Sequence, residues 1–161
     1  MEITVTSPLN TCEGSIRCDG ANDCSLLFAD SANWAGTVVA GNVSLTNLTD
    51  GAAAARVDFA KLNLVADFPI RAWRGEDGKL AGDRLDVGEY INNGGKIVPV
   101  MMTEDADFNI GDELFLGEMN AGTSLPKVVA GWNVRAVPVE GNGSKVLLTL
   151  KRGDGFSVFV R

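Results

Sequence analysis

The sequence predicts an all-β fold, and three observations support this prediction. Apolar runs of roughly five residues recur along the chain, and each is closed by glycine, asparagine, aspartate or proline. The 19 glycines among 161 residues indicate many turns. No long stretch has the periodicity of an amphipathic helix. Short strands with frequent turns are typical of a sandwich, a barrel or a solenoid.

We expect one domain over residues 1–161, because this length and 45% hydrophobic residues suffice for a single core. Residues 1–33 hold strand-like pieces between turn signals and are the hardest to assign. Residues 34–80 are interpreted as successive rungs of a solenoid, because short strands alternate there with glycine and asparagine turns. Residues 81–161 are assigned to terminal rungs and a cap, although no fixed repeat length emerges.

Alternation of apolar residues predicts which side chains face the core. The Asp77-Gly78 turn predicts a β-hairpin, and Asn142-Gly143 separates two further apolar runs. Residues 146–150 and 156–160 are predicted to pair as a C-terminal hairpin, which together with Trp132 would form the cap. The predicted inward pairs and triplets are Val43 and Leu45, Val57 and Phe59, Leu62 and Leu64, Phe68, Ile70 and Ala72, and Leu85 and Val87.

Charge and hydropathy restrict the partners. The net charge of -7 argues against nucleic acid, because phosphate binding needs clustered lysine and arginine. No apolar run approaches the ~20 residues of a membrane helix, so we expect no membrane insertion. The N-terminus lacks a secretory signal, and the chain begins and ends inside strand patterns. We therefore expect part of a longer exported chain.

Several motifs in the second half resemble a known family. They are Asp83-Arg84-Leu85-Asp86-Val87-Gly88, Gly94–Val100, Ile110–Leu116, Leu125-Pro126, Gly131–Val134 and Lys145–Leu150. Their order resembles the C-terminal passenger region of bacterial autotransporter-type proteins of the pectin-lyase-like β-helix class. The match covers roughly residues 80–150, and residues 34–70 look like preceding rungs. The resemblance implies a right-handed parallel β-helix or its cap, exported, with a mainly structural role and no catalytic residues. An antiparallel β-sandwich is the alternative fold.

Catalysis finds little support. The chain has no histidine, which excludes Ser-His-Asp and Cys-His pairs, and it has no phosphate-binding loop, so we expect no cofactor and no enzyme. A polysaccharide-cleaving β-helix would need carboxylates and a basic residue facing one groove. Four aspartates are candidates for such a surface, although their spacing does not require it: Asp58, Asp67, Asp83 and Asp86.

Two groups of residues are weak candidates for metal binding or cross-linking. Glu104, Asp105 and Asp107 offer grouped oxygens of the kind that Ca²⁺ prefers, but a solvated acidic loop is the favoured interpretation. The cysteines at positions 12, 18 and 24 lack a close Cys-x2-Cys pair, which disfavours zinc. One disulfide between two of Cys12, Cys18 and Cys24, or three ordinary thiols, remain open interpretations.

Arg152, Gly153 and Asp154 form a tripeptide of the type that binds integrins on exposed turns, and the same residues make an ordinary charged turn, which is favoured. Trp34, Trp73 and Trp132 would stack on sugar rings if exposed, but core positions are favoured.

The sequence therefore favours a non-enzymatic structural or adhesive segment of a bacterial cell-surface protein, with a host-surface protein or a glycan as partner. A carbohydrate-binding or carbohydrate-cleaving β-helix module is the first alternative, and a small β-sandwich binding module is the second.

Overall fold

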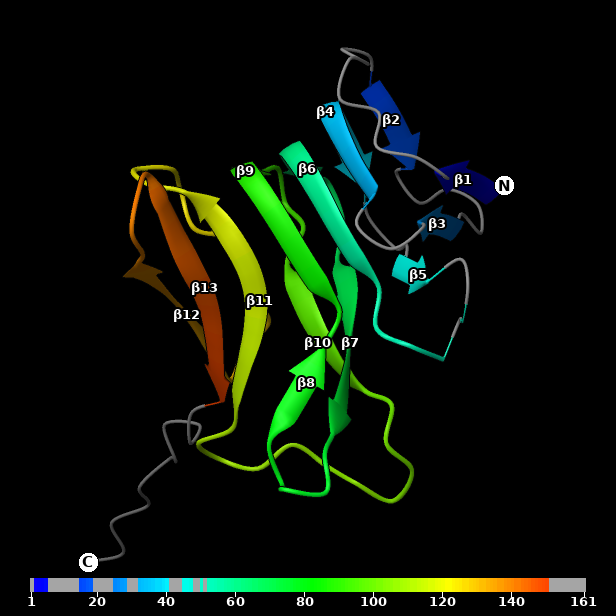
Figure 1. Ribbon diagram of the computed structural model, residues 1–161, viewed down its shortest axis with the longest axis vertical. Coiled ribbons are helices and arrows are strands. Elements are labelled where there is room, and N and C mark those ends of the chain that lie inside the picture. The colour runs from blue at the N-terminus through cyan, green and yellow to red at the C-terminus, as the bar shows by residue number, and fades with distance from the viewer. Residues whose placement is uncertain are drawn as a thin grey trace, which may run out of the picture.

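The computed structural model describes residues 2–5, 15–18, 25–28, 32–40, 45–47, 50 and 52–150. Within them every regular element is a β-strand, which confirms the all-β prediction (Figure 1). No helix in this part of the chain is long and apolar enough to span a membrane. The strands are β1 (Glu2–Val5), β2 (Ser15–Cys18), β3 (Ser25–Phe28), β4 (Ala32–Ala40), β5 (Leu45–Asn47), β6 (Arg56–Leu64), β7 (Phe68–Arg74), β8 (Leu80–Gly82), β9 (Arg84–Asn92), β10 (Ile97–Met101), β11 (Glu113–Asn120), β12 (Trp132–Pro138) and β13 (Gly143–Leu150).

The strands form three open sheets. A seven-stranded sheet has the order β12-β13-β11-β9-β6-β4-β2, and two three-stranded sheets have the orders β1-β3-β5 and β10-β7-β8. Neighbours from β2 to β11 in the large sheet pair in parallel, whereas β11, β13 and β12 pair antiparallel. The sheets are therefore mixed.

The chain passes back and forth between the large sheet and the small ones. After β2 it enters β3, returns in β4, enters β5, returns in β6, enters β7, and so on. Within the large sheet, Val38 lies opposite Ile16, 22 positions earlier, and opposite Leu62, 24 positions later. Leu62 lies opposite Tyr90, 28 positions later. Each return thus pairs its residues with those of the previous return, at unequal intervals along the chain.

The core consists of the apolar side chains that alternation predicts. The inward positions of β6, β7 and β9 are buried as expected, and so is Leu45; Val43 lies outside the described residues. The strands β7 and β10 lie behind the lower parts of β6 and β9 in Figure 1, and their side chains join one cluster. The fully buried members with the largest side chains are Phe59, Phe68, Leu45, Leu62, Leu64, Ile70, Leu85, Ile97, Leu114 and Leu116.

The parallel strands β6 and β9 share an irregularity at one level. Burial alternates through Phe59 in β6, then skips a position before it resumes at Leu62, and β9 behaves in the same way after Val87. The irregularity in β11 lies at a different level, because Gly117, with φ of 152°, stands beside Leu85, two positions before Val87. A Cβ at Gly117 would lie 2.1 Å from the carbonyl oxygen of Leu85, so only glycine fits this approach.

The C-terminal hairpin differs from its prediction. Both edges of β13 are paired, one with β11 and the other with β12. Residues 146–150 therefore form a hairpin with the strand that precedes them, and the predicted pairing with residues 156–160, which lie outside the described residues, is wrong. Trp132 is buried at this hairpin, with its ring edge-on to Phe108 at 5.1 Å between centroids.

A buried ion pair links β7 to the segments that precede β6 and β9. Asp83 is fully buried, and its carboxylate accepts hydrogen bonds from Nε and Nη2 of Arg71 at 3.1 and 3.0 Å. The same carboxylate accepts the backbone N–H groups of Ala55 and Arg71 at 2.8 and 3.0 Å. Arg71 also donates to the carbonyl of Ala53 at 3.0 Å, and its guanidinium lies 5.2 Å from the ring centroid of Trp73. The Asp83 carboxylate thus accepts hydrogen bonds from two other segments and links three segments in all.

On the side of β10 that faces away from β7, backbone pairing stops after Ile97. The N–H and C=O groups of Ile97 pair outward with Lys127 and Val129, whereas residues 96 and 102 pair with β7. Because amide groups alternate between the two sides of a strand, Pro99 shares the outward direction with Ile97. Proline has no N–H group, so this edge offers no donor at that position.

Candidate functional site

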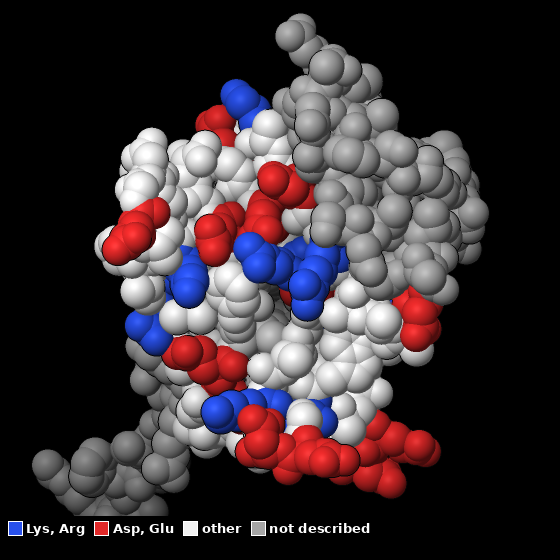
Figure 2. All heavy atoms as spheres, in the orientation of Figure 1, with Lys and Arg blue, Asp and Glu red and all other residues white. Residues whose placement is uncertain are grey.

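An open groove lies on the outer face of β6, β9 and β11. Its volume is about 650 Å³, which lies within the range of ligand sites in proteins. Its polar side chains come from all three strands and from the β12–β13 turn. Figure 2 shows acidic side chains beside basic ones on the face over β6 and β9, and a separate acidic group at the lower end. The polar lining residues are Asp58, Arg84, Asp86, Glu118, Asn120 and Asn142.

Three of these residues form a row of carboxylates across the strands. Asp58 in β6 pairs directly with Asp86 in β9. Glu118 precedes Met119, which pairs with Val87, so Glu118 occupies the matching position in β11. Adjacent strands lie about 4.8 Å apart. The sheet therefore presents one acidic side chain on each of three consecutive parallel strands.

Arg84 contacts two of the three carboxylates in this row, those of Asp86 and Glu118. Its Nε donates to both carboxylate oxygens of Asp86 at 2.8 and 3.0 Å, and its Nη2 lies 3.7 Å from Oε1 of Glu118. The Asp86 carboxylate also accepts the backbone N–H of Glu118 at 2.7 Å, and the Arg84 guanidinium lies 5.5 Å from the ring centroid of Phe115. These contacts fix Arg84, Asp86 and Glu118 relative to one another.

Asp58 is the member of the row that lacks such contacts. Within the described part of the chain it makes no hydrogen bond or ion pair. Partial burial and the nearby Asp86 carboxylate raise the pKa of Asp58, while Arg84 acts in the opposite direction. A cation or a hydrogen-bond donor from a ligand would therefore stabilise its ionised form.

The floor and the far side of the groove are formed by small and amide residues. A Cβ at Gly88 would lie 2.6 Å from the carbonyl oxygen of Ala60 and 3.1 Å from Nδ2 of Asn120. Gly88 therefore lets β6 approach and lets the Asn120 side chain lie beside the backbone. Asn142, from the β12–β13 turn, completes this side.

The four aspartates that were predicted for such a surface separate into three groups. Asp58 and Asp86 lie in the groove. Asp67 is exposed between β6 and β7, away from the groove lining. Asp83 is fully buried in the ion pair with Arg71, so its prediction as an outward residue is wrong.

Sequence reasoning missed Glu118 and Arg84 as members of the site. The signal that would have identified Glu118 is one outward acid in each successive strand, at equivalent positions. That signal becomes readable only when the register between β9 and β11 is known.

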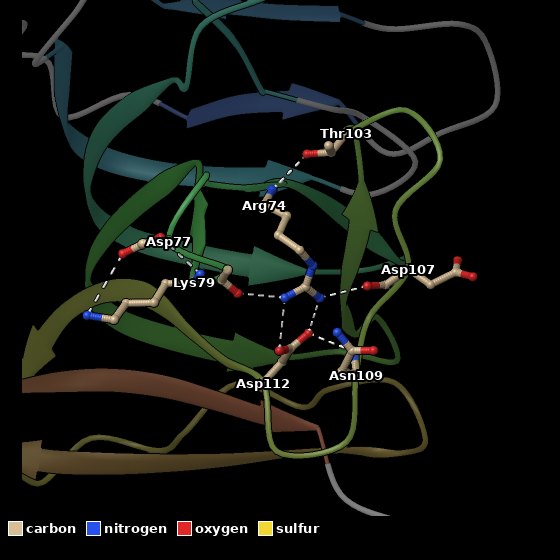
Figure 3. A network of polar contacts seen from close by, with 8 residues as sticks. Arg74, Asp77, Lys79, Thr103, Asp107, Asn109 and Asp112 are labelled. Atoms are coloured by element: carbon tan, nitrogen blue, oxygen red, sulfur yellow. Dashed lines mark hydrogen bonds and ion pairs between the residues drawn. The ribbon is translucent and has the colours of Figure 1, made fainter.

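The acidic loop after β10 is held by an arginine. Arg74 bonds both carboxylate oxygens of Asp112, at 3.3 and 2.5 Å, and donates to the carbonyls of Gly78 and Asp107 at 2.8 and 2.7 Å (Figure 3). Its backbone N–H donates to Oγ1 of Thr103 at 2.7 Å. This network joins the β7–β8 turn to both ends of the loop.

The calcium candidates lie in that loop. Glu104, Asp105 and Asp107 are exposed, and Asp107 contributes its backbone carbonyl, not its carboxylate, to the Arg74 network. Among the described residues no three acidic or cysteine side chains are grouped so that they would hold a metal ion. The arrangement therefore lends no support to a calcium site.

The remaining candidates lie mostly outside the described residues. These include Cys12 and Cys24 and the tripeptide Arg152, Gly153 and Asp154, while Cys18 is described only as part of the backbone of β2. Trp34 is likewise known only through the backbone of β4. Trp132 is buried and Trp73 is half-buried, and neither lines the groove.

The chemistry available in the groove is that of carboxylates, one guanidinium and two amides. These groups suit hydrogen bonding to hydroxyl and amino groups. A carboxyl group with a raised pKa beside a second carboxyl group is also an arrangement on which acid catalysis of glycoside cleavage relies. Comparisons with protein family models, curated proteins and solved structures found no significant match.

Proposed function

We propose that the chain is a non-enzymatic structural or adhesive segment of an exported bacterial cell-surface protein, built as a right-handed parallel β-helix. The observation that carries the proposal is the order of strand pairing. From β2 to β11 the chain alternates between the large sheet and the small ones, and β4, β6, β9 and β11 each pair in parallel with the strand one return earlier in the large sheet. Such stacking of similar units is what a solenoid requires.

The C-terminal part supports the proposal as a cap. A solenoid end exposes unpaired strand edges, which must be covered. The antiparallel hairpin of β12 and β13 follows the last parallel strand, β11, and buries Trp132 there. Two facing mixed sheets in a sandwich are the alternative arrangement of the same strands.

Small-angle X-ray scattering of the purified chain separates these arrangements. A β-helix is elongated along the stacking axis, so a scattering profile of a rod-shaped particle is expected. A compact, nearly isotropic particle would contradict the β-helix and favour the sandwich.

A second candidate function is carbohydrate binding or cleavage, and the groove favours it. Its three carboxylates, one arginine and two amides face an open concave surface, as a glycan site requires. Cleavage is tested by incubating the chain with a panel of polysaccharides and measuring new reducing ends. Product formation that disappears in both Asp58→Asn and Asp86→Asn, but not in Glu89→Gln, would overturn the non-enzymatic proposal. Glu89 is a matched control, because it lies on β9 but outside the groove and pairs with Lys61 at 3.1 Å.

A further inference from the structure

The groove repeats one carboxylate per strand, and this repeat restricts the ligands that fit. We propose that the groove binds a linear glycan whose sugar units carry free amino groups, with Asp58, Asp86 and Glu118 facing successive ammonium groups. This inference rests on the glycan-binding alternative above and names the class of glycan.

The geometry of the row favours an extended ligand. The carboxylates lie on three neighbouring strands in register, and strands in a sheet lie about 4.8 Å apart. The row therefore crosses the strands along the stacking direction. A chain of repeated cationic units meets a negative group at each strand, whereas a single compact cation would meet only one or two.

The balance of charge favours a cation. The groove lining contains three acidic side chains and a single basic one, Arg84. Arg84 is already bonded to Asp86 and lies near Glu118. The Asp58 side chain makes no hydrogen bond or ion pair within the described residues, and partial burial together with the neighbouring Asp86 raises its pKa. An arriving ammonium group offsets this repulsion, while a carboxylate on the ligand would add to it.

The other side of the groove favours a sugar over a simple polyamine. Asn120 and Asn142 supply amide donors and acceptors, which match hydroxyl groups that a polyamine lacks. Gly88 and Ala60 leave the floor free of long side chains, so the backbone of a glycan has room to lie flat across it.

Calorimetric titration of the whole chain with fully deacetylated glucosamine oligomers tests the inference. At about pH 6 amino groups are protonated and ordinary carboxyl groups are ionised. We expect binding that weakens as salt is raised. The N-acetylated oligomers, spermine and polylysine should each bind roughly tenfold more weakly, because each lacks either the charge or the hydroxyl groups.

Asp58→Asn is the informative variant, because it removes a carboxylate that makes no hydrogen bond or ion pair within the described structure. It should retain the fold and weaken binding roughly tenfold, as expected for loss of a charge-assisted hydrogen bond. Glu89→Gln should leave binding unchanged. Circular dichroism of both variants checks that the fold is intact.

Three results would overturn the inference: equal binding of N-acetylated oligomers, equal binding of spermine or polylysine, or no difference between the two variants. If neutral glycans bind as well as charged ones, the glycan-binding function survives and only the selection for amines fails. If no glycan binds, both fail, while the scattering test of the β-helix remains independent.

Discussion

Removal of the buried carboxylate of Asp83 should be among the most destabilising single changes in the chain. Asp83→Ala removes the fully buried carboxylate that faces the Arg71 guanidinium, whose side chain is 10% exposed. It also leaves the backbone N–H groups of Ala55 and Arg71 without their acceptor. Breaking a buried pair by removing one partner costs about 3–5 kcal/mol. Since domains of this kind unfold at a cost of about 5–15 kcal/mol, the variant should lose a large fraction of its stability.

Urea unfolding followed by tryptophan fluorescence measures this loss. Trp73 is a local probe because the Arg71 guanidinium lies over its ring. For a urea dependence of about 2 kcal/mol per molar, a loss of about 4 kcal/mol lowers the midpoint by about 2 M. The exposed pair of Lys61 and Glu89 is the matched control, and Glu89→Ala should change stability by less than about 1 kcal/mol.

A double variant separates the effect of the broken Arg71–Asp83 ion pair from the effect of the lost backbone hydrogen bonds. Arg71→Met with Asp83→Asn removes both charges and keeps one side-chain oxygen, which can accept one of the two backbone N–H groups. It should be more stable than Asp83→Ala, because the positive charge of Arg71 is removed together with the carboxylate. The reasoning would be refuted if Asp83→Ala moved the midpoint no more than Glu89→Ala does.

Three further predictions concern other positions. Tyr90→Phe should leave stability unchanged or raise it by up to about 1 kcal/mol, because the buried hydroxyl has no hydrogen-bond partner among the described residues; a lower urea midpoint would reveal a partner. Gly117→Ala should lower stability by more than about 1 kcal/mol in the same assay, because its Cβ would meet the Leu85 carbonyl and its φ is unfavourable for alanine; an unchanged midpoint would contradict this. Asp112→Asn should lower stability most above about pH 4. The hydrogen bond from Arg74 lowers the pKa of Asp112, so this stabilisation is present above the carboxyl's ordinary pKa and is lost as pH falls through the lowered one. The difference between variant and parent, measured by thermal unfolding, should therefore shrink in acid, and a difference independent of pH would contradict the prediction.

The core could be predicted from sequence because its signal is local. In β6 and β7 the side chains alternate between core and solvent, and Phe59, Leu62 and Phe68 were assigned correctly from that pattern alone. Alternation needs only the residues of one strand. The prediction did not need to know which strands pair.

Strand partners were harder to predict because they depend on distant residues. A turn-rich segment after Leu150 suggested a hairpin with the following residues, yet β13 already has partners on both edges. No fixed repeat could be recognised, because the interval between paired residues grows from 22 at Ile16 and Val38 to 32 at Val87 and Met119. The loops between the strands differ in length. Paired residues therefore lie side by side in the sheet although the number of residues between them varies.

The candidate site shows the same limit. Asp58 and Asp86 were identified because alternation places them outward on strands. Asp83 was assigned the same role, but it lies between β8 and β9, directly after the β7–β8 hairpin, and this hairpin brings it beside its partner Arg71. Glu118 directly follows the irregularity at Gly117, where simple alternation fails.

The missing donor at Pro99 limits how this molecule meets others of its kind. A segment that tried to extend the pairing begun at Ile97 would find an acceptor at the next outward position but nothing to donate to its own carbonyl. Free sheet margins are where folded chains recruit one another into fibres. Pro99 therefore disfavours edge-to-edge association along β10 without the need for a charged side chain. Replacing it with a residue that has a backbone N–H group would remove this protection.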